Sequence, residues 1–179
     1  MHQVFYRTFL RVFSLCAFML VVNMSLANAA DRPVLYEIGV QNFCARMNQV
    51  GESNNLLKME SASIADIQND SCIIKMKYPF RSKVEAYSFF DSSESLYKLK
   101  VNAIDGTAYK SDSFLSAVDV VYEALRIVGM NHTEAFKAIQ SATDSSVKSS
   151  STWYGDRYYT VRIKNNGTTA VFELTASTP

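Results

Sequence analysis

Histidine and glycine are scarce in this 179-residue chain, which contains two histidines and six glycines. A serine or cysteine nucleophile usually needs a histidine base, and His132 is the single histidine beyond the N-terminal region. Because His132 stands between Asn131 and Thr133 at an expected helix start, we interpret it as a solvated residue rather than a catalytic base. The sequence also has no Gly-x-Ser-x-Gly turn, phosphate-binding glycine loop or His-Glu-x-x-His motif. These absences argue against the common hydrolase and nucleotide-binding mechanisms.

Long apolar runs are absent from most of the chain, and the one that occurs lies near the N-terminus at residues 12–22. Arg7 and Arg11 precede it, without any acidic residue. A membrane-spanning helix needs about 20 apolar residues, roughly twice the length of this run. The pattern therefore favours a signal peptide over a membrane anchor.

A cleavage site follows the apolar run, because Ala27 and Ala29 form the small-x-small arrangement that signal peptidase recognises. We predict that residues 1–29 are a cleaved secretory signal peptide of bacterial type. The mature chain, residues 30–179, is then expected to be a single domain, periplasmic or secreted, with no membrane span.

An excess of charge of either sign is also missing. Removal of Arg7 and Arg11 leaves 18 − 2 = 16 basic residues against 17 acidic ones. This balance gives no indication that nucleic acid or an anionic membrane surface is a partner.

Two cysteines, Cys44 and Cys72, remain after signal cleavage. In an oxidising compartment such a pair is typical of a disulfide, and we predict one that joins an N-terminal helix to the first strand. The alternative is two buried thiols. A zinc site is disfavoured because only one histidine remains to complete four ligands, so we expect no metal and no cofactor.

Hydrophobic periodicity places helices and strands along the mature chain. Helical spacing of apolar residues predicts helices over 34–50, ended by Gly51, over 111–129, and from Asn131 onward. Alternation predicts strands over 72–78, 83–90, 96–104, 157–164 and 168–176, the last two joined by a hairpin at Asn165-Asn166-Gly167.

Two segments carry no strand pattern. Residues 52–70 are polar apart from Ile64 and Ile67, which would fit one helical turn, and the Ser-rich residues 141–152 are expected to form a flexible loop. The order is helix, three strands, helical hairpin, two strands. It predicts an α+β fold with a mostly antiparallel sheet of about five strands and helices packed on one face.

A weak internal repeat leaves open a second interpretation, in which the two halves of the chain arose by duplication. A helix that ends in Val-Gly is expected twice, at Val50-Gly51 and at Val128-Gly129, and each is followed by strands. The offsets between matched pieces are not constant, so a duplication remains an alternative to independent halves.

Acidic residues offer one route to catalysis, because paired carboxylates can hydrolyse glycosides. Asp91 with Glu94 or Asp105 are the acids near expected strand ends. The same positions are where turns ordinarily place acids.

Aromatic residues are concentrated between positions 153 and 159. Trp153, Tyr154 and Tyr158 are close to Arg157 in the sequence, and such side chains are favoured at binding surfaces. Alternation would send Tyr159 into the core, so packing within the sheet is the alternative for part of this cluster. The Tyr87 and Phe89 face of strand 83–90 is a second candidate surface.

The leading hypothesis is therefore an exported, non-catalytic protein-binding module, such as an inhibitor or immunity-type protein of the cell envelope, that binds through Trp153, Tyr154, Arg157 and Tyr158. Its partner would be another envelope or extracellular protein. One alternative is a small-ligand carrier with an apolar pocket between sheet and helices. A carboxylate-dependent envelope hydrolase is a third possibility.

Overall fold

The computed structural model describes residues 35–53, 61–68, 71–78, 83–91, 93, 95–108 and 111–179. All of them belong to one compact unit, Arg32–Pro179. The expected signal peptide, residues 1–29, and the candidate acid Glu94 lie outside the described residues. None of the helices in the described part of the chain is both long and apolar enough to cross a membrane.

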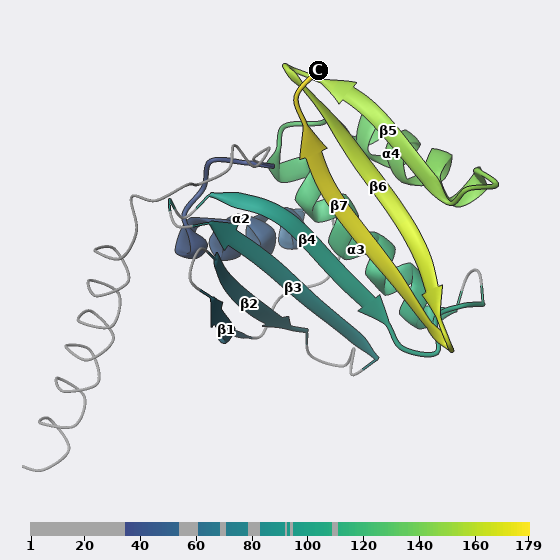
Figure 1. The fold of residues 1–179 in the computed structure, drawn as a ribbon, viewed down its shortest axis with the longest axis horizontal. Coiled ribbons are helices and arrows are strands. Elements are labelled where there is room, and N and C mark those ends of the chain that lie inside the picture. The colour runs from purple at the N-terminus through teal and green to yellow at the C-terminus, as the bar shows by residue number, and fades with distance from the viewer. Residues whose placement is uncertain are drawn as a thin grey trace, which may run out of the picture. The chain divides into compact units, whose positions relative to one another are not determined.

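A seven-stranded antiparallel sheet forms one layer, with strand order β1-β2-β3-β4-β7-β6-β5 (Figure 1). The strands are β1 (Ser61–Gln68), β2 (Ser71–Lys77), β3 (Val84–Asp91), β4 (Leu96–Ala103), β5 (Ser149–Tyr154), β6 (Arg157–Asn166) and β7 (Thr169–Ser177). Two meanders, β1–β4 and β5–β7, meet where β4 pairs with β7. The α+β class is therefore confirmed, with seven strands in place of about five.

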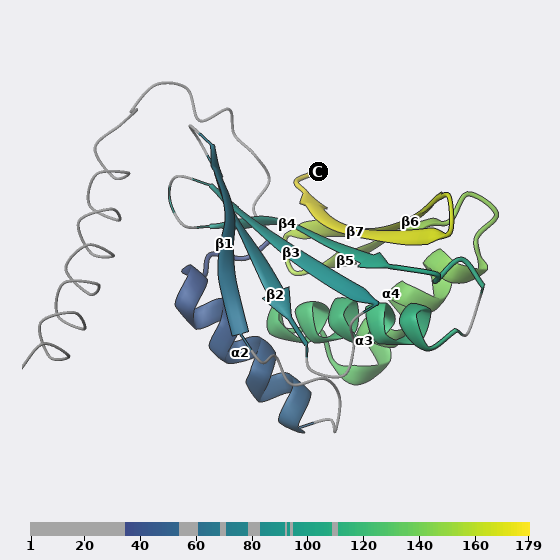
Figure 2. The same ribbon diagram turned by 90° about the horizontal axis from the view of Figure 1, so that it is seen from below.

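Three helices form the second layer: α2 (Val40–Ser53), α3 (Asp112–Ile127) and α4 (His132–Asp144). Figure 2 shows all three on the same side of the sheet. Aromatic pairs join the layers, with Phe43 of α2 against Phe90 of β3 at 5.8 Å and Phe114 of α3 against Phe172 of β7 at 5.0 Å between ring centroids. The hydrophobic core lies between the helices and this face of the sheet.

The helical hairpin follows from local sequence signals. Ser111 caps α3 by accepting a hydrogen bond from the backbone N–H of Phe114. Gly129, with φ of 106°, ends the helix in a conformation that suits glycine. Asn131 and Glu134 then form the capping box of α4. Both predicted helices are present.

The first helix differs from the prediction at both ends. It begins at Val40, because Leu35 and Tyr36 are extended and hydrogen-bond with Leu96 at the start of β4. Gly51 does not end the helix but is a buried residue inside it.

Two strands were not predicted, and both lie at edges of the sheet. β1 occupies part of the polar segment in which Ile64 and Ile67 were expected to form a helical turn. β5 occupies the end of the expected flexible loop, and α4 extends into its beginning as far as Asp144. The described side chains of β1 are exposed on both faces of the strand, so no apolar alternation marks it.

The expected disulfide is not formed in the structure, since neither Cys44 nor Cys72 is bridged. Cys44 lies on α2, whereas Cys72 is near the start of β2. Both cysteines are half-buried and pack against the core. Burial also raises the pKa of the Cys44 thiol, so apolar packing rather than a covalent bond accounts for these positions.

Candidate functional site

The sheet face opposite the helices, which we term the open face, is covered by no element of the described chain. Figure 1 looks onto this face, with the helices behind the strands. Burial alternates along the central strands, so that on β6 Tyr159, Val161 and Ile163 are buried against the helices while Tyr158 and Arg162 are exposed. Alternation therefore assigns every second side chain to a surface available for binding.

Trp153 and Tyr158 form an aromatic pair on this face. They are directly opposite each other in the β5–β6 hairpin, with ring centroids 4.7 Å apart in an edge-to-face arrangement. Both remain exposed, at 48% and 42%. Two of the four predicted binding residues thus meet on the open face.

The other two predicted residues, Tyr154 and Arg157, face the helix side. They are also paired across β5 and β6, one position along from Trp153 and Tyr158, and strand alternation reverses their direction. The Tyr154 hydroxyl donates a 2.6 Å hydrogen bond to the carbonyl of Gly129, and Arg157 lies beside Asp156. Tyr154 therefore connects β5 to the turn between α3 and α4.

A second aromatic group lies over β3 and β4 on the open face. Phe89 contacts Tyr97 at 6.2 Å between ring centroids, and the Lys98 ammonium lies 5.5 Å from the centre of the Phe89 ring. Lys75 is placed similarly over Tyr87 at 5.4 Å. A β-bulge at Phe89 and Phe90 changes the register, so Leu96 rather than Tyr97 enters the core.

A cluster of charged residues, which we term the Glu173 cluster, occupies the centre of the open face on β4, β7 and β6. It consists of Glu173 with Lys98, Lys100, Arg162 and Lys164. Glu173 bonds Lys98 through Oε1 at 3.0 Å and Lys164 through Oε2 at 2.9 Å. Lys100 and Arg162 are the residues directly opposite Glu173 on the two neighbouring strands.

The electrostatics of Glu173 reflect this crowding of cations. Its partial burial alone would raise its pKa, but the hydrogen-bonded ammonium groups of Lys164 and Lys98 lower it below its ordinary value. The two lysines therefore favour the ionised form of Glu173, and Lys100 and Arg162 lie at the paired positions of the neighbouring strands.

The candidate catalytic acids do not form a pair among the described residues. Asp91 accepts hydrogen bonds from the backbone N–H groups of Ser93 and Ser95 in the β3–β4 turn. Asp105 follows the other end of β4 and bonds Lys83. The length of β4 separates them by on the order of 20 Å, whereas glycosidase carboxylates lie about 5–10 Å apart. The pairing of Asp91 with Asp105 is wrong, and that with Glu94 falls outside the described residues.

His132 is exposed at the start of α4 but is not merely solvated. Its Nδ1 lies 2.9 Å from the Tyr122 hydroxyl, and its ring stacks on Phe136 at 6.3 Å. It has no described acid or nucleophile as a hydrogen-bond partner. These contacts suit a role in holding α3 and α4 together.

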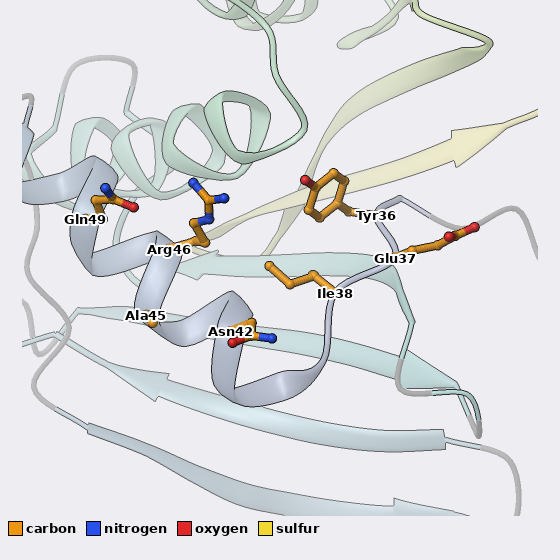
Figure 3. A pocket seen from close by; sticks show the side chains of 7 residues that line it. All are labelled: Tyr36, Glu37, Ile38, Asn42, Ala45, Arg46 and Gln49. Carbon is orange, nitrogen blue, oxygen red and sulfur yellow. The ribbon is translucent and has the colours of Figure 1, made fainter.

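The surface formed by the described residues includes a hollow beside α2 and a smaller one between the layers. One, of about 490 Å³, lies beside α2 and is lined by Tyr36, Glu37, Ile38, Asn42, Ala45, Arg46 and Gln49. Figure 3 shows that α2 and the segment before it supply these side chains. The other, of about 140 Å³, is lined by residues that include Phe114, Thr143 and Ile163, from both layers.

No cluster of histidine, cysteine, aspartate and glutamate able to hold a metal ion occurs among the described residues. Comparison with known proteins finds no matching family, no similar curated protein and no similar solved structure.

Proposed function

We propose that this protein is an exported, non-catalytic protein-binding module of the cell envelope, an inhibitor or immunity-type protein, whose partner docks on the open face at Trp153 and Tyr158. The observation that carries the proposal is the exposed aromatic pair on a sheet face that no element of the described chain covers. Tryptophan and tyrosine contribute much of the binding energy at protein interfaces. The cross-strand contact holds both rings in place, so little conformational entropy remains to be lost on binding.

Export is part of the same proposal, and it is supported by the N-terminal sequence. Fractionation of the native host followed by N-terminal sequencing tests it. We expect the protein outside the cytoplasm with Ala30 or Asp31 as its first residue. A cytoplasmic protein that retains residues 1–29 would contradict this part.

Photo-crosslinking in the native host can identify the partner. A benzoylphenylalanine at Ser151, which is exposed on the open face beside Thr160, leaves the aromatic pair intact. The same probe at Phe136 on α4 serves as the matched control, because that side chain is also exposed, at 53%. We expect a specific protein adduct from position 151 and not from position 136.

Affinity for the purified partner then tests the surface. Trp153→Ala with Tyr158→Ala should weaken binding by about tenfold or more, the effect of truncating a central aromatic residue at an interface. Phe136→Ala should leave affinity unchanged. Equal affinities for the double variant and the wild type, measured by calorimetry, would show that the partner binds elsewhere.

A small-ligand carrier is the second candidate, favoured by one observation. The hollow beside α2 has a volume of about 490 Å³, within the usual range of about 300–1,000 Å³ for ligand pockets. Its lining includes Asn42, Arg46 and Gln49, so a ligand there would be polar rather than apolar. Native mass spectrometry of protein purified from its own host would reveal a retained ligand as a mass adduct.

A further inference from the structure

We infer that the docking partner presents a carboxylate-rich segment to the Glu173 cluster, where Lys100 and Arg162 receive its acidic side chains. This inference rests on the proposed function and adds the chemistry of the partner to it. The open face would then recognise a segment with an aromatic-binding part and an acidic part.

The Glu173 cluster contains more positive charge than its own carboxylate can neutralise. Four cations stand against one carboxylate, which gives the group a net charge of 4 − 1 = +3. Both oxygens of Glu173 are already bonded, one to Lys98 and one to Lys164. Lys100 and Arg162 have no carboxylate partner among the described residues, although both are directly opposite Glu173.

This local excess contrasts with the chain as a whole. The full sequence has 18 basic and 17 acidic residues, so the excess of positive charge at the cluster is local and is not a property of the whole chain. A concentrated field of this kind attracts an oppositely charged surface and orients it during the encounter. The guanidinium of Arg162 can also bind a carboxylate through two parallel hydrogen bonds.

Part of the Glu173 cluster and one member of the aromatic pair lie along the same strand, β6. Tyr158, Arg162 and Lys164 all project from the open face of β6, and Tyr158 and Arg162 are separated by about 13 Å of strand. A partner segment of four or five extended residues would span that distance, since such a chain extends by about 3.3 Å per residue. One segment can therefore contact both groups.

Protein carboxylates fit this surface better than a nucleic acid backbone. Glu85 and Glu173 are ionised on the same face, each bonded to lysine, and the pKa of Glu85 is lowered by its hydrogen bond to Lys75. A regularly spaced phosphate chain that crosses the sheet would meet both carboxylates. Separate acidic side chains can be placed on Lys100 and Arg162 alone.

Poly-L-glutamate is the probe for this inference, and it does not require the partner to be known. Binding to the full mature chain is measured by calorimetry at low and at physiological salt. We expect measurable binding that weakens with salt and falls about tenfold or more in Lys100→Gln with Arg162→Gln. The control, Lys137→Gln, removes one lysine exposed on α4 and should leave binding within about twofold.

Several results would overturn the inference. They are a loss in Lys137→Gln as large as that in Lys100→Gln with Arg162→Gln, no binding of poly-L-glutamate by the wild type, or tighter binding of oligothymidylate or of vesicles with one-fifth phosphatidylglycerol. Circular dichroism and unfolding midpoints confirm that the variants fold. Because the aromatic-pair experiment uses the captured partner and this one uses poly-L-glutamate, failure of either proposal is seen separately.

Discussion

The two faces of the sheet are built from the same strands but hold together in different ways. On the helix side, residues such as Leu99, Val101 and Phe172 are fully buried in a common core. On the open face, Lys98, Lys100 and Glu173 alternate with them and are half-buried by one another. Burial of apolar area stabilises the first face, and charge-assisted hydrogen bonds organise the second.

This difference indicates which face folding requires and which face is left for binding. An open face could be covered with small polar residues at little cost to stability. It instead carries large aromatic side chains and a cluster of cations, with the Trp153 and Tyr158 pair at the β5–β6 edge. Exposed groups of this kind are explained better by a partner than by the fold itself.

The largest expected effect comes from truncating one aromatic residue on each face. Phe172→Ala should lower the free energy of unfolding by about 3–5 kcal/mol, because it removes a fully buried ring and leaves a cavity beside Phe114. Phe89→Ala on the open face should cost less than half as much, since Phe89 is only partly buried. Urea unfolding measures both. Equal losses would mean that the open face is also a structural core.

Acid should weaken the open face more than the core, and Glu173 is the residue that reports it. Its folded pKa lies below its ordinary value of about 4.3. Its contribution is therefore fully present above the unfolded pKa and is lost as pH falls through the folded pKa. Glu173→Gln should cost about 1.5–3 kcal/mol at pH 7, the range for a hydrogen bond to a charged group.

Unfolding of Glu173→Gln and of the wild type from pH 7 to pH 3 tests this sign. The two stabilities should converge as pH falls below the ordinary glutamate pKa of about 4.3 and through the lowered pKa of folded Glu173, because the wild-type carboxylate becomes protonated there. Lys137→Gln on α4 is the control for the loss of one exposed charge. A constant difference between variant and wild type across this range would contradict the lowered pKa.

The central strands could be predicted from sequence because apolar and polar residues alternate along them, one kind for each face of the sheet. β3, β4, β6 and β7 place mostly apolar side chains at every second position, apart from the buried Ser88 of β3 and the bulge before Leu99. The helix caps at Ser111 and Asn131 were equally local signals. The sequence of each of these elements is therefore sufficient to predict it, and all of them are present in the structure.

The edge strands could not be predicted in the same way. β1 is buried on neither face, so its Ile64 and Ile67, three positions apart, suggested a helical turn. A shift of register between Ile64 and Asp66 interrupts its alternation as well. β5 is rich in serine, a composition typical of loops. What makes both segments strands is pairing with a neighbour, which is a property of the whole sheet.

The candidate site was predicted in part for the same reason. Trp153 and Tyr158 stood out by composition, but their separation from Tyr154 and Arg157 depends on the hairpin at Gly155 and Asp156, which the loop interpretation had hidden. The Glu173 cluster was missed altogether. Its members come from β4, β6 and β7, and only the pairing of β4 with β7 brings Lys100 beside Glu173.

The smallest expected effect compares two tyrosines from neighbouring positions of one hairpin that face opposite sides. Tyr154→Phe should lower the free energy of unfolding by about 1 kcal/mol, the net value of a hydrogen bond such as the one from its hydroxyl to the Gly129 carbonyl. Tyr158→Phe keeps the ring contact with Trp153 and should change stability by less than about 0.5 kcal/mol. Hydrogen exchange at the amides of β5 should accelerate only in Tyr154→Phe, because that bond attaches the edge strand to the helical hairpin. If Tyr158→Phe were the more damaging of the two, the assignment of these side chains to opposite faces would have to be reversed, and with it the place proposed for the partner.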